Sequence, residues 1–104
     1  MLTQEEKRII IKAVSVIQSI KPGDKLTLRS GNLEIDKNPN LLIRWFSGDS
    51  KYVTMRHIKY VVENALEMDI KLDTTGLKNL QETYSGNKYV QDSILMLLHA
   101  IETN

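Results

Sequence analysis

The chain has 104 residues, of which 41% are apolar, and a formal net charge of +1. This is enough for one hydrophobic core and too little for two ordinary domains, so we expect a single domain over residues 1–104. The absence of cysteine excludes disulfides, thiolate metal sites and thiol nucleophiles. No apolar run approaches the roughly 20 residues that span a bilayer, and Glu5 and Glu6 stand where a secretory signal needs basic residues. We therefore expect a soluble, intracellular, cytoplasmic protein without membrane association.

The first predicted helix begins with a capping box, Thr3-Gln4-Glu5-Glu6, in which the Thr3 side chain accepts from the amide of Glu6 and the Glu6 side chain accepts from that of Thr3. Apolar residues then recur at helical spacing and predict a helix over about 4–19. Pro22 and Gly23 follow in an order typical of a type II turn. The apolar stripe of this helix is Ile9, Ile10, Ala13, Val14, Ile17 and Ile20.

Residues 25–36 predict one small β-hairpin. If Ser30-Gly31 forms a two-residue connection, Leu28 faces Leu33 and Leu26 faces Ile35. All four apolar side chains then lie on one face, and we expect that face to pack on the helices.

Asn38-Pro39 is typical of a helix start, with the proline in the first turn. The short helix that follows carries Trp45 and Phe46, which we expect to anchor the core. Residues 41–46 also have strand propensity, so a strand remains an alternative for this segment.

Gly48 suits the position just after a helix end, and Asp49 or Ser50 can cap the next helix. The pattern predicts that a long amphipathic helix begins here and extends to about Met68. Its buried stripe comprises Met55, Ile58, Val61, Val62, Ala65 and Leu66.

Two more helices complete the chain. Asp73 or Thr74 caps the first of them, which ends at Ser85-Gly86, and Asn87 caps the second, whose stripe includes Ile94. Because few residues join them, they should be antiparallel neighbours. The predicted fold is mainly α, a single compact domain of about five helices with one small β-hairpin at residues 25–36.

The sequence contains no convincing catalytic or metal motif. Gly48-Asp49-Ser50 has the residues of a hydrolase block, but a serine nucleophile needs a positioned base, and helix capping accounts for the same residues. His57 and His99 lack the short spacing to another ligand that metal sites show. We therefore expect no enzyme activity, cofactor or metal.

Charge is distributed unevenly and suggests an anionic partner. From Lys21 to Lys59 there are eight basic and four acidic residues, and from Tyr60 onward there are three basic and seven acidic. Basic side chains interleaved with tyrosines are typical of nucleic-acid contacts, although the two halves of the chain can also pair with each other. The residues predicted for an anion or nucleic-acid contact are Arg44, Lys51, Tyr52, Arg56 and Lys59.

Several apolar residues lie off the main helix stripes: Ile11, Val16, Leu95 and Met96. They either widen the core or form a face for self-association or a protein partner. For the methionines, Met55, Met68 and Met96, filling of the core is favoured over a soft binding groove.

Two motifs give the chain a family resemblance. Arg44-Trp45-x-x-Gly48-x-Ser50-Lys51-x-x-Thr54 and Gly76-Leu77-x-x-Leu80-x-x-Thr83-Tyr84 resemble a pattern in small, uncharacterised helical proteins of large DNA viruses. The resemblance covers about residues 41–101. It implies a viral protein with a structural or host-interaction role, located in the virion or the host cell.

The function predicted from these features is that of a small non-enzymatic binding or assembly protein that acts through exposed helix surfaces. The alternative is a nucleic-acid-associated protein that uses the basic segment 21–59.

Overall fold

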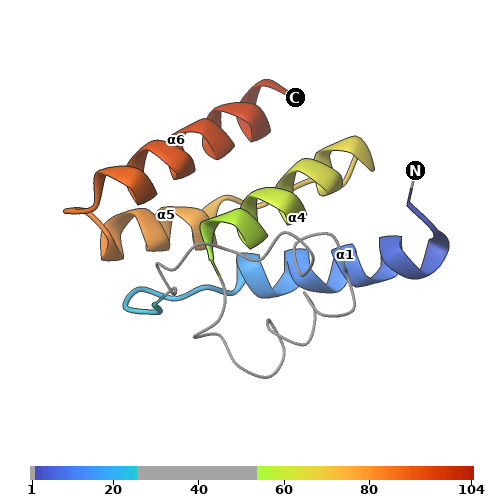
Figure 1. The fold of residues 1–104 in the computed structure, drawn as a ribbon, viewed down its shortest axis with the longest axis horizontal. Helices are drawn as coiled ribbons and strands as arrows, with labels where there is room; N and C mark the ends of the chain where they lie inside the picture. The colour runs from blue at the N-terminus through green and yellow to red at the C-terminus, as the bar shows by residue number, and fades with distance from the viewer. Residues whose placement is uncertain (1, 26–53) are drawn as a thin grey trace.

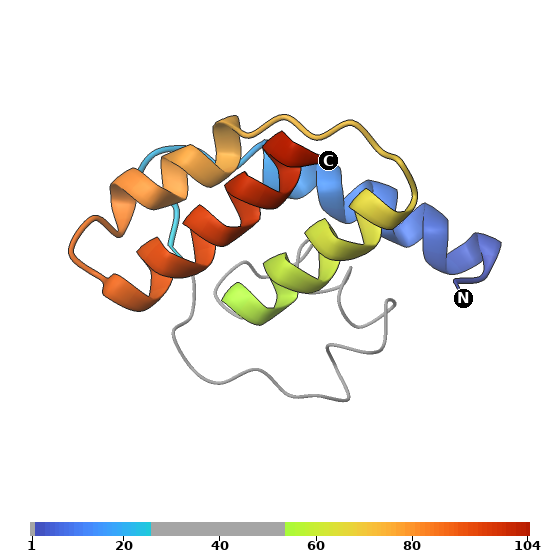
Figure 2. The same cartoon turned by 90° about the horizontal axis from the view of Figure 1, so that it is seen from above.

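The computed structural model describes residues 2–25 and 54–104. This part of the chain forms four helices in the order α1 (Gln4–Gln18), α4 (Met55–Glu67), α5 (Thr75–Thr83) and α6 (Lys88–Thr103). Helices α1 and α4 run in opposite directions, as do α5 and α6, whereas α4 and α6 lie side by side and run in the same direction (Figures 1 and 2). Helix α1 packs against α4 and α5, and α6 packs against the same two helices.

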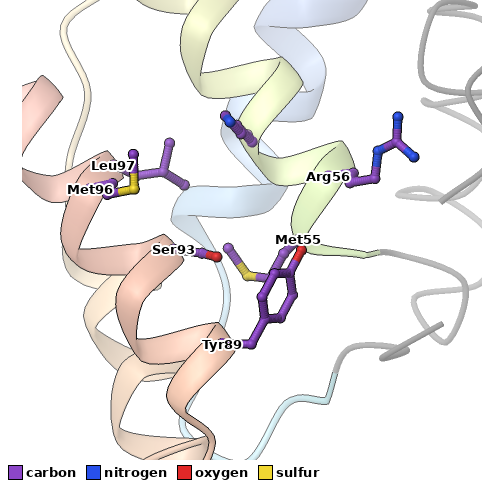
Figure 3. Close-up of a pocket in the computed structure, with 7 residues that line it drawn as sticks. Met55, Arg56, Tyr89, Ser93, Met96 and Leu97 are labelled. Atoms are coloured by element: carbon purple, nitrogen blue, oxygen red, sulfur yellow. The ribbon is translucent and has the colours of Figure 1, made fainter. Parts of the chain in front are cut away.

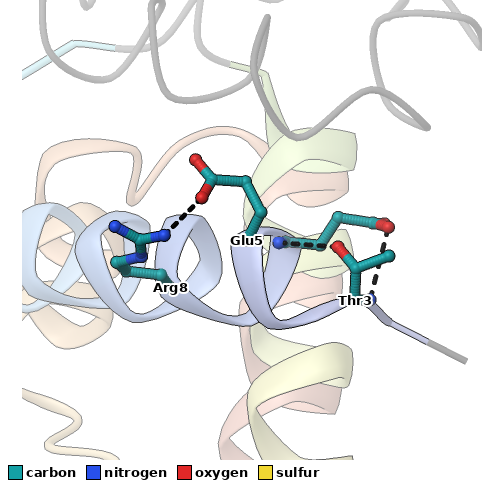
Figure 4. Close-up of polar contacts among 4 residues, drawn as sticks. Thr3, Glu5 and Arg8 are labelled. Carbon is teal, nitrogen blue, oxygen red and sulfur yellow. Dashed lines mark hydrogen bonds and ion pairs between the residues drawn. The ribbon is translucent and has the colours of Figure 1, made fainter.

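Helix α1 begins with the predicted capping box. The Glu6 amide donates to Thr3 Oγ1 over 3.1 Å, and the Thr3 amide donates to Glu6 Oε1 over 3.3 Å (Figure 4). On the exposed side of the same turns, Arg8 pairs with Glu5. The helix ends at Gln18, one residue before the predicted end, so this prediction is confirmed.

The turn after α1 is tied to α5. The Asp24 amide donates to the Lys21 carbonyl over 3.1 Å, and Gly23 has φ +91°, which agrees with the predicted type II turn. The Gly23 amide also donates to Thr83 Oγ1 over 2.9 Å. The turn therefore fixes the end of α1 on the last turn of α5.

Helix α4 begins later than predicted. Its N-cap is Thr54, whose Oγ1 accepts from the His57 amide, while His57 Nδ1 accepts from the Thr54 amide over 3.0 Å. This is a capping box with histidine in the place of the usual Glu or Gln. The prediction that Asp49 or Ser50 opens this helix is therefore wrong, although its end near Met68 is confirmed.

Helices α5 and α6 form the predicted antiparallel pair. Asp73 Oδ1 accepts from the amide and the hydroxyl of Thr75 at the start of α5, and Asn87 Oδ1 accepts from the Val90 amide at the start of α6. The corner between them is closed by Gln91, whose Nε2 donates to the carbonyls of Gln81 over 2.6 Å and Tyr84 over 2.8 Å. One side chain on α6 thus binds the last carbonyls of α5.

The core lies between the four helices and contains most residues of the predicted stripes, while Ile20 and Leu66 are only partly buried against it. Ile10, Ile58, Leu80 and Ile94 are completely buried, and each comes from a different helix. Gly76 lets α5 approach α1 closely, because a Cβ at this position would lie only 2.0 Å from the carbonyl oxygen of Ile17. The core cluster comprises Ile10, Ala13, Val14, Ile17, Met55, Ile58, Val61, Val62, Ala65, Leu77, Leu80, Val90, Ile94, Leu97 and Leu98.

The predicted fold class needs correction. Its mainly helical character is confirmed, but the combination of about five helices and a β-hairpin is wrong for residues 2–25 and 54–104, which form four helices and no strand. The described stripes bury one another, so this core needs no sheet to cover it. Lys25, where the predicted hairpin begins, is not in a strand. The rest of that hairpin and the short helix after Asn38-Pro39 lie outside the described residues.

Other predictions also fall outside the described residues. These are the core-anchoring roles of Trp45 and Phe46 and the helix stop at Gly48. Among the helices that the structure describes, none is long and apolar enough to cross a bilayer.

Candidate functional site: a groove between α4 and α6

Residues 55–59 of α4 and 89–97 of α6 form an open groove of about 170 Å³, which we name the α4–α6 groove. Because the two helices are parallel neighbours, residues from their first turns face each other across it. Tyr89 extends from α6 toward Met55 at the start of α4 (Figure 3). The groove is lined by Met55, Arg56, Lys59, Tyr89, Ser93, Met96 and Leu97.

Helical spacing accounts for the lining. Tyr89, Ser93 and Met96 are separated by four and three residues, so they lie along one edge of α6. Arg56 and Lys59, three residues apart, do the same on α4. The caps at Thr54 and Asn87 fix where the two helices begin, and therefore which residues meet.

The groove has an apolar floor and, on the α6 side, a partly apolar wall. Met55 and Leu97 are buried beneath it, with 3% and 5% of their surface exposed. In contrast, Tyr89 and Met96 expose 60% and 68%. Large apolar side chains that remain this exposed beside a depression are typical of a surface that a partner covers.

The charged residues among the described groove lining are basic. Lys59 is exposed and lies 4.0 Å from Glu63 Oε1, and Arg56 is half-buried. None of the described lining residues is acidic, and neither α4 nor α6 has an acidic residue in its first turn. The positive ends of both helix dipoles therefore add to the positive potential of the two cations.

The structure brings together only part of the predicted anion-contact set. Arg56 and Lys59 line the same groove, whereas Arg44, Lys51 and Tyr52 lie outside the described residues. Gly48, Asp49 and Ser50 lie outside them as well, so the hydrolase alternative receives no test.

Tyr60, another tyrosine of the basic segment, lies away from this site. It packs against the core, and burial together with the nearby Glu6 carboxylate raises the pKa of its hydroxyl. Its surroundings are thus those of the α1–α4 interface.

The two histidines have different surroundings. His57 is completely buried, and its Nδ1 lies 2.8 Å from Thr54 Oγ1 as well as accepting the Thr54 amide. This supports a structural role in capping α4. His99 is exposed on α6. Within the described ranges, no group of three His, Asp or Glu residues is placed to hold a metal ion.

Sequence reasoning missed Tyr89 and misjudged Met96. Met55 and Met68 pack in or against the core as expected, but Met96 is largely exposed. Tyr89 and Met96 are seven residues apart, which places them on one edge of a helix, and this spacing was an available signal. Leu95, the neighbouring off-stripe residue, is 53% exposed but does not line the groove.

Comparison with known proteins gave no match. No protein-family model fits the chain, and no curated protein or solved structure is significantly similar to it. The resemblance to helical proteins of large DNA viruses therefore stays a prediction, and the site has to be interpreted from its own geometry.

Proposed function

We propose that this chain is a small, non-enzymatic binding protein that holds a segment of a partner protein in the α4–α6 groove. The observation that carries the proposal is the exposure of Tyr89 and Met96 beside an apolar floor of Met55 and Leu97. Burial of exposed apolar surface of this kind is the main driving force of protein association.

The size of the groove supports a protein segment over a small molecule. Its volume of about 170 Å³ is below the roughly 300 to 1,000 Å³ of pockets that enclose drug-sized ligands. It fits one or two anchoring side chains, as when a peptide or an amphipathic helix docks in a groove. In the context implied by the viral resemblance, the partner is a virion component or a host protein.

The proposal is tested by selecting binders from a random 16-residue peptide display library on the immobilised full-length chain. Dissociation constants of selected peptides are then measured for the wild type and two variants. Met96→Glu places a charge in the groove, whereas Leu95→Glu makes the same change at an exposed apolar neighbour outside it. Burying a methionine contributes about 1.5–3 kcal/mol, so Met96→Glu should weaken binding at least about tenfold.

The matched variant makes the outcome specific. Leu95→Glu should leave the affinity within about twofold of the wild type, because this exposed side chain does not line the groove. Selected peptides that bind both variants as they bind the wild type would contradict the proposal, and so would a failure to recover any peptide.

Nucleic-acid association is the second candidate function. The observation that favours it is the presence of Arg56, Lys59 and the exposed ring of Tyr89 in one groove, which offers phosphate contacts and a surface for base stacking. Binding to oligonucleotides should then weaken with salt and weaken further when Arg56 and Lys59 are replaced by alanine. Salt-independent or undetectable binding would exclude this function.

A further inference from the structure

We propose that the occupant of the α4–α6 groove is an acidic amphipathic peptide segment, with an apolar residue that enters the groove and a carboxylate beside it that reaches Lys59. This inference rests on the proposed function and specifies the chemistry of the partner. It follows from the way apolar and charged groups are arranged around the groove.

The first argument is charge complementarity. Among the described residues that line the groove, two are cationic and none is acidic. Lys59 lies 4.0 Å from Glu63 on the same helix, and this distance leaves the ammonium group able to turn toward a second carboxylate. The first turns of α4 and α6 have no acidic residue, so the fields of both helix starts also favour an anion.

The second argument concerns the kind of anion. Met55 and Leu97 form an apolar floor, and Met96 forms an apolar wall. A carboxylate is not stabilised by contact with such an apolar surface, and an apolar group is not stabilised by the cations. A peptide that carries an apolar side chain one helical turn from a glutamate or aspartate uses both.

The surroundings of the groove argue against a polyanion. A nucleic acid requires a continuous track of cations along its backbone. Here Glu63 and Glu67 follow along α4, and Asp92, which pairs with Lys88 over 3.1 Å, lies on α6. A phosphate chain that followed α4 or α6 would pass these carboxylates, whereas a single peptide carboxylate at Lys59 needs no continuous track of cations.

The experiment uses the peptides selected on the full-length chain. Their sequences should be enriched in Asp and Glu close to a large apolar residue. Replacing these acids by the corresponding amides should weaken binding by roughly fivefold at 0.1 M salt, which is the scale of one exposed ion pair. Exchanging the charges, with Lys59→Glu in the protein and Lys in the peptide, should restore the affinity.

The chain offers a matched control for the charge reversal. Lys59 pairs with Glu63 on α4, and Lys88 pairs with Asp92 on α6, each at a spacing of four residues. Both lysines are exposed, but only Lys59 lines the groove. Lys59→Glu should lower the affinity for the peptides by roughly fivefold, and Lys88→Glu should leave this affinity unchanged.

The outcomes separate this inference from the proposed function. The selected peptides could lack acidic enrichment, lose affinity for Met96→Glu and keep their affinity for Lys59→Glu. This result would overturn the inference that the partner is acidic, but it would still support the groove as the binding site. Peptides insensitive to both substitutions would overturn both. A 12-nucleotide DNA strand that binds at low micromolar concentration and depends on Lys59 would overturn the peptide in favour of nucleic acid. A dimer detected by light scattering and abolished by Met96→Glu would make a second copy the occupant instead.

Discussion

The close approach of α5 to α1 at Gly76 makes a sharp prediction about stability. In a Gly76→Ala variant, the new Cβ would lie 2.0 Å from the carbonyl oxygen and 3.0 Å from the carbonyl carbon of Ile17. These are backbone atoms in the last turns of α1, so they cannot rotate away as the end of a side chain would. The two helices must separate until the contact reaches an ordinary distance.

The magnitude follows from that separation. Moving a well-packed surface outward by 0.5–1 Å already forfeits about a quarter to a half of its dispersion energy, and Leu77 and Leu80 on α5 would lose contacts in this way. We expect this overpacking to destabilise the fold by about 3 kcal/mol, near the top of the usual range. Alanine has a higher helix propensity than glycine, which offsets up to about 1 kcal/mol of this loss.

The net loss of about 2 kcal/mol should lower Tm by roughly 8–16 °C in a domain of this size. Thermal and urea unfolding followed by circular dichroism measures it. Gly86→Ala is the matched control, because no atom lies within 4 Å of a Cβ at that position, and it should change stability by less than about 0.5 kcal/mol. A Gly76→Ala protein as stable as the wild type would refute the reasoning.

Two further predictions concern helix starts. His57→Ala removes a completely buried side chain and leaves the Thr54 amide without its acceptor, so it should destabilise the fold by about 3 kcal/mol in urea unfolding. His99→Ala, at an exposed position, is the control. Equal destabilisation by the two substitutions would contradict the capping role of His57. The two hydrogen bonds from Thr75 lower the pKa of Asp73 below its ordinary value of 3.8. Since the folded-state pKa is the lower one, the carboxylate stabilises the fold above about pH 4, and this contribution is lost as the pH falls through the folded pKa. An NMR titration should place the Asp73 midpoint below 3.8, and Asp73→Asn should make acid unfolding less dependent on pH; a midpoint at or above 3.8 would refute this.

The parts of the fold that follow from local signals were predictable. The cap at Thr3, the turn at Pro22-Gly23 and the cap at Asn87 each depend on a few neighbouring residues, and each appears as predicted. The predicted start of α4 was wrong because the sequence offers two possible caps, one at Asp49 or Ser50 and one at Thr54. The Thr54–His57 box was overlooked since histidine is not the usual partner of a capping threonine.

The candidate site was less predictable because it depends on tertiary structure. Arg56 and Lys59 were found from charge and spacing on one helix. Their position opposite Tyr89 and Met96 depends on α4 and α6 being parallel neighbours, although 20 residues separate the end of the first from the start of the second. Short connections predict contacts such as that of α5 with α6, but they carry no information about helices that are distant in sequence.

The hydrogen bonds of Gln91 at the corner between α5 and α6 have a consequence for how partner preference can change. The angle at which α6 leaves α5 is secured from inside the corner, by a side chain that does not belong to the groove lining. The orientation of α6 on α5 therefore depends on a residue that is not on the groove walls. If the groove holds a partner segment as we propose, substitutions at Tyr89, Ser93 or Met96 can alter which segment is bound while the α5–α6 corner stays intact, so a new specificity can evolve or be engineered without rebuilding the domain.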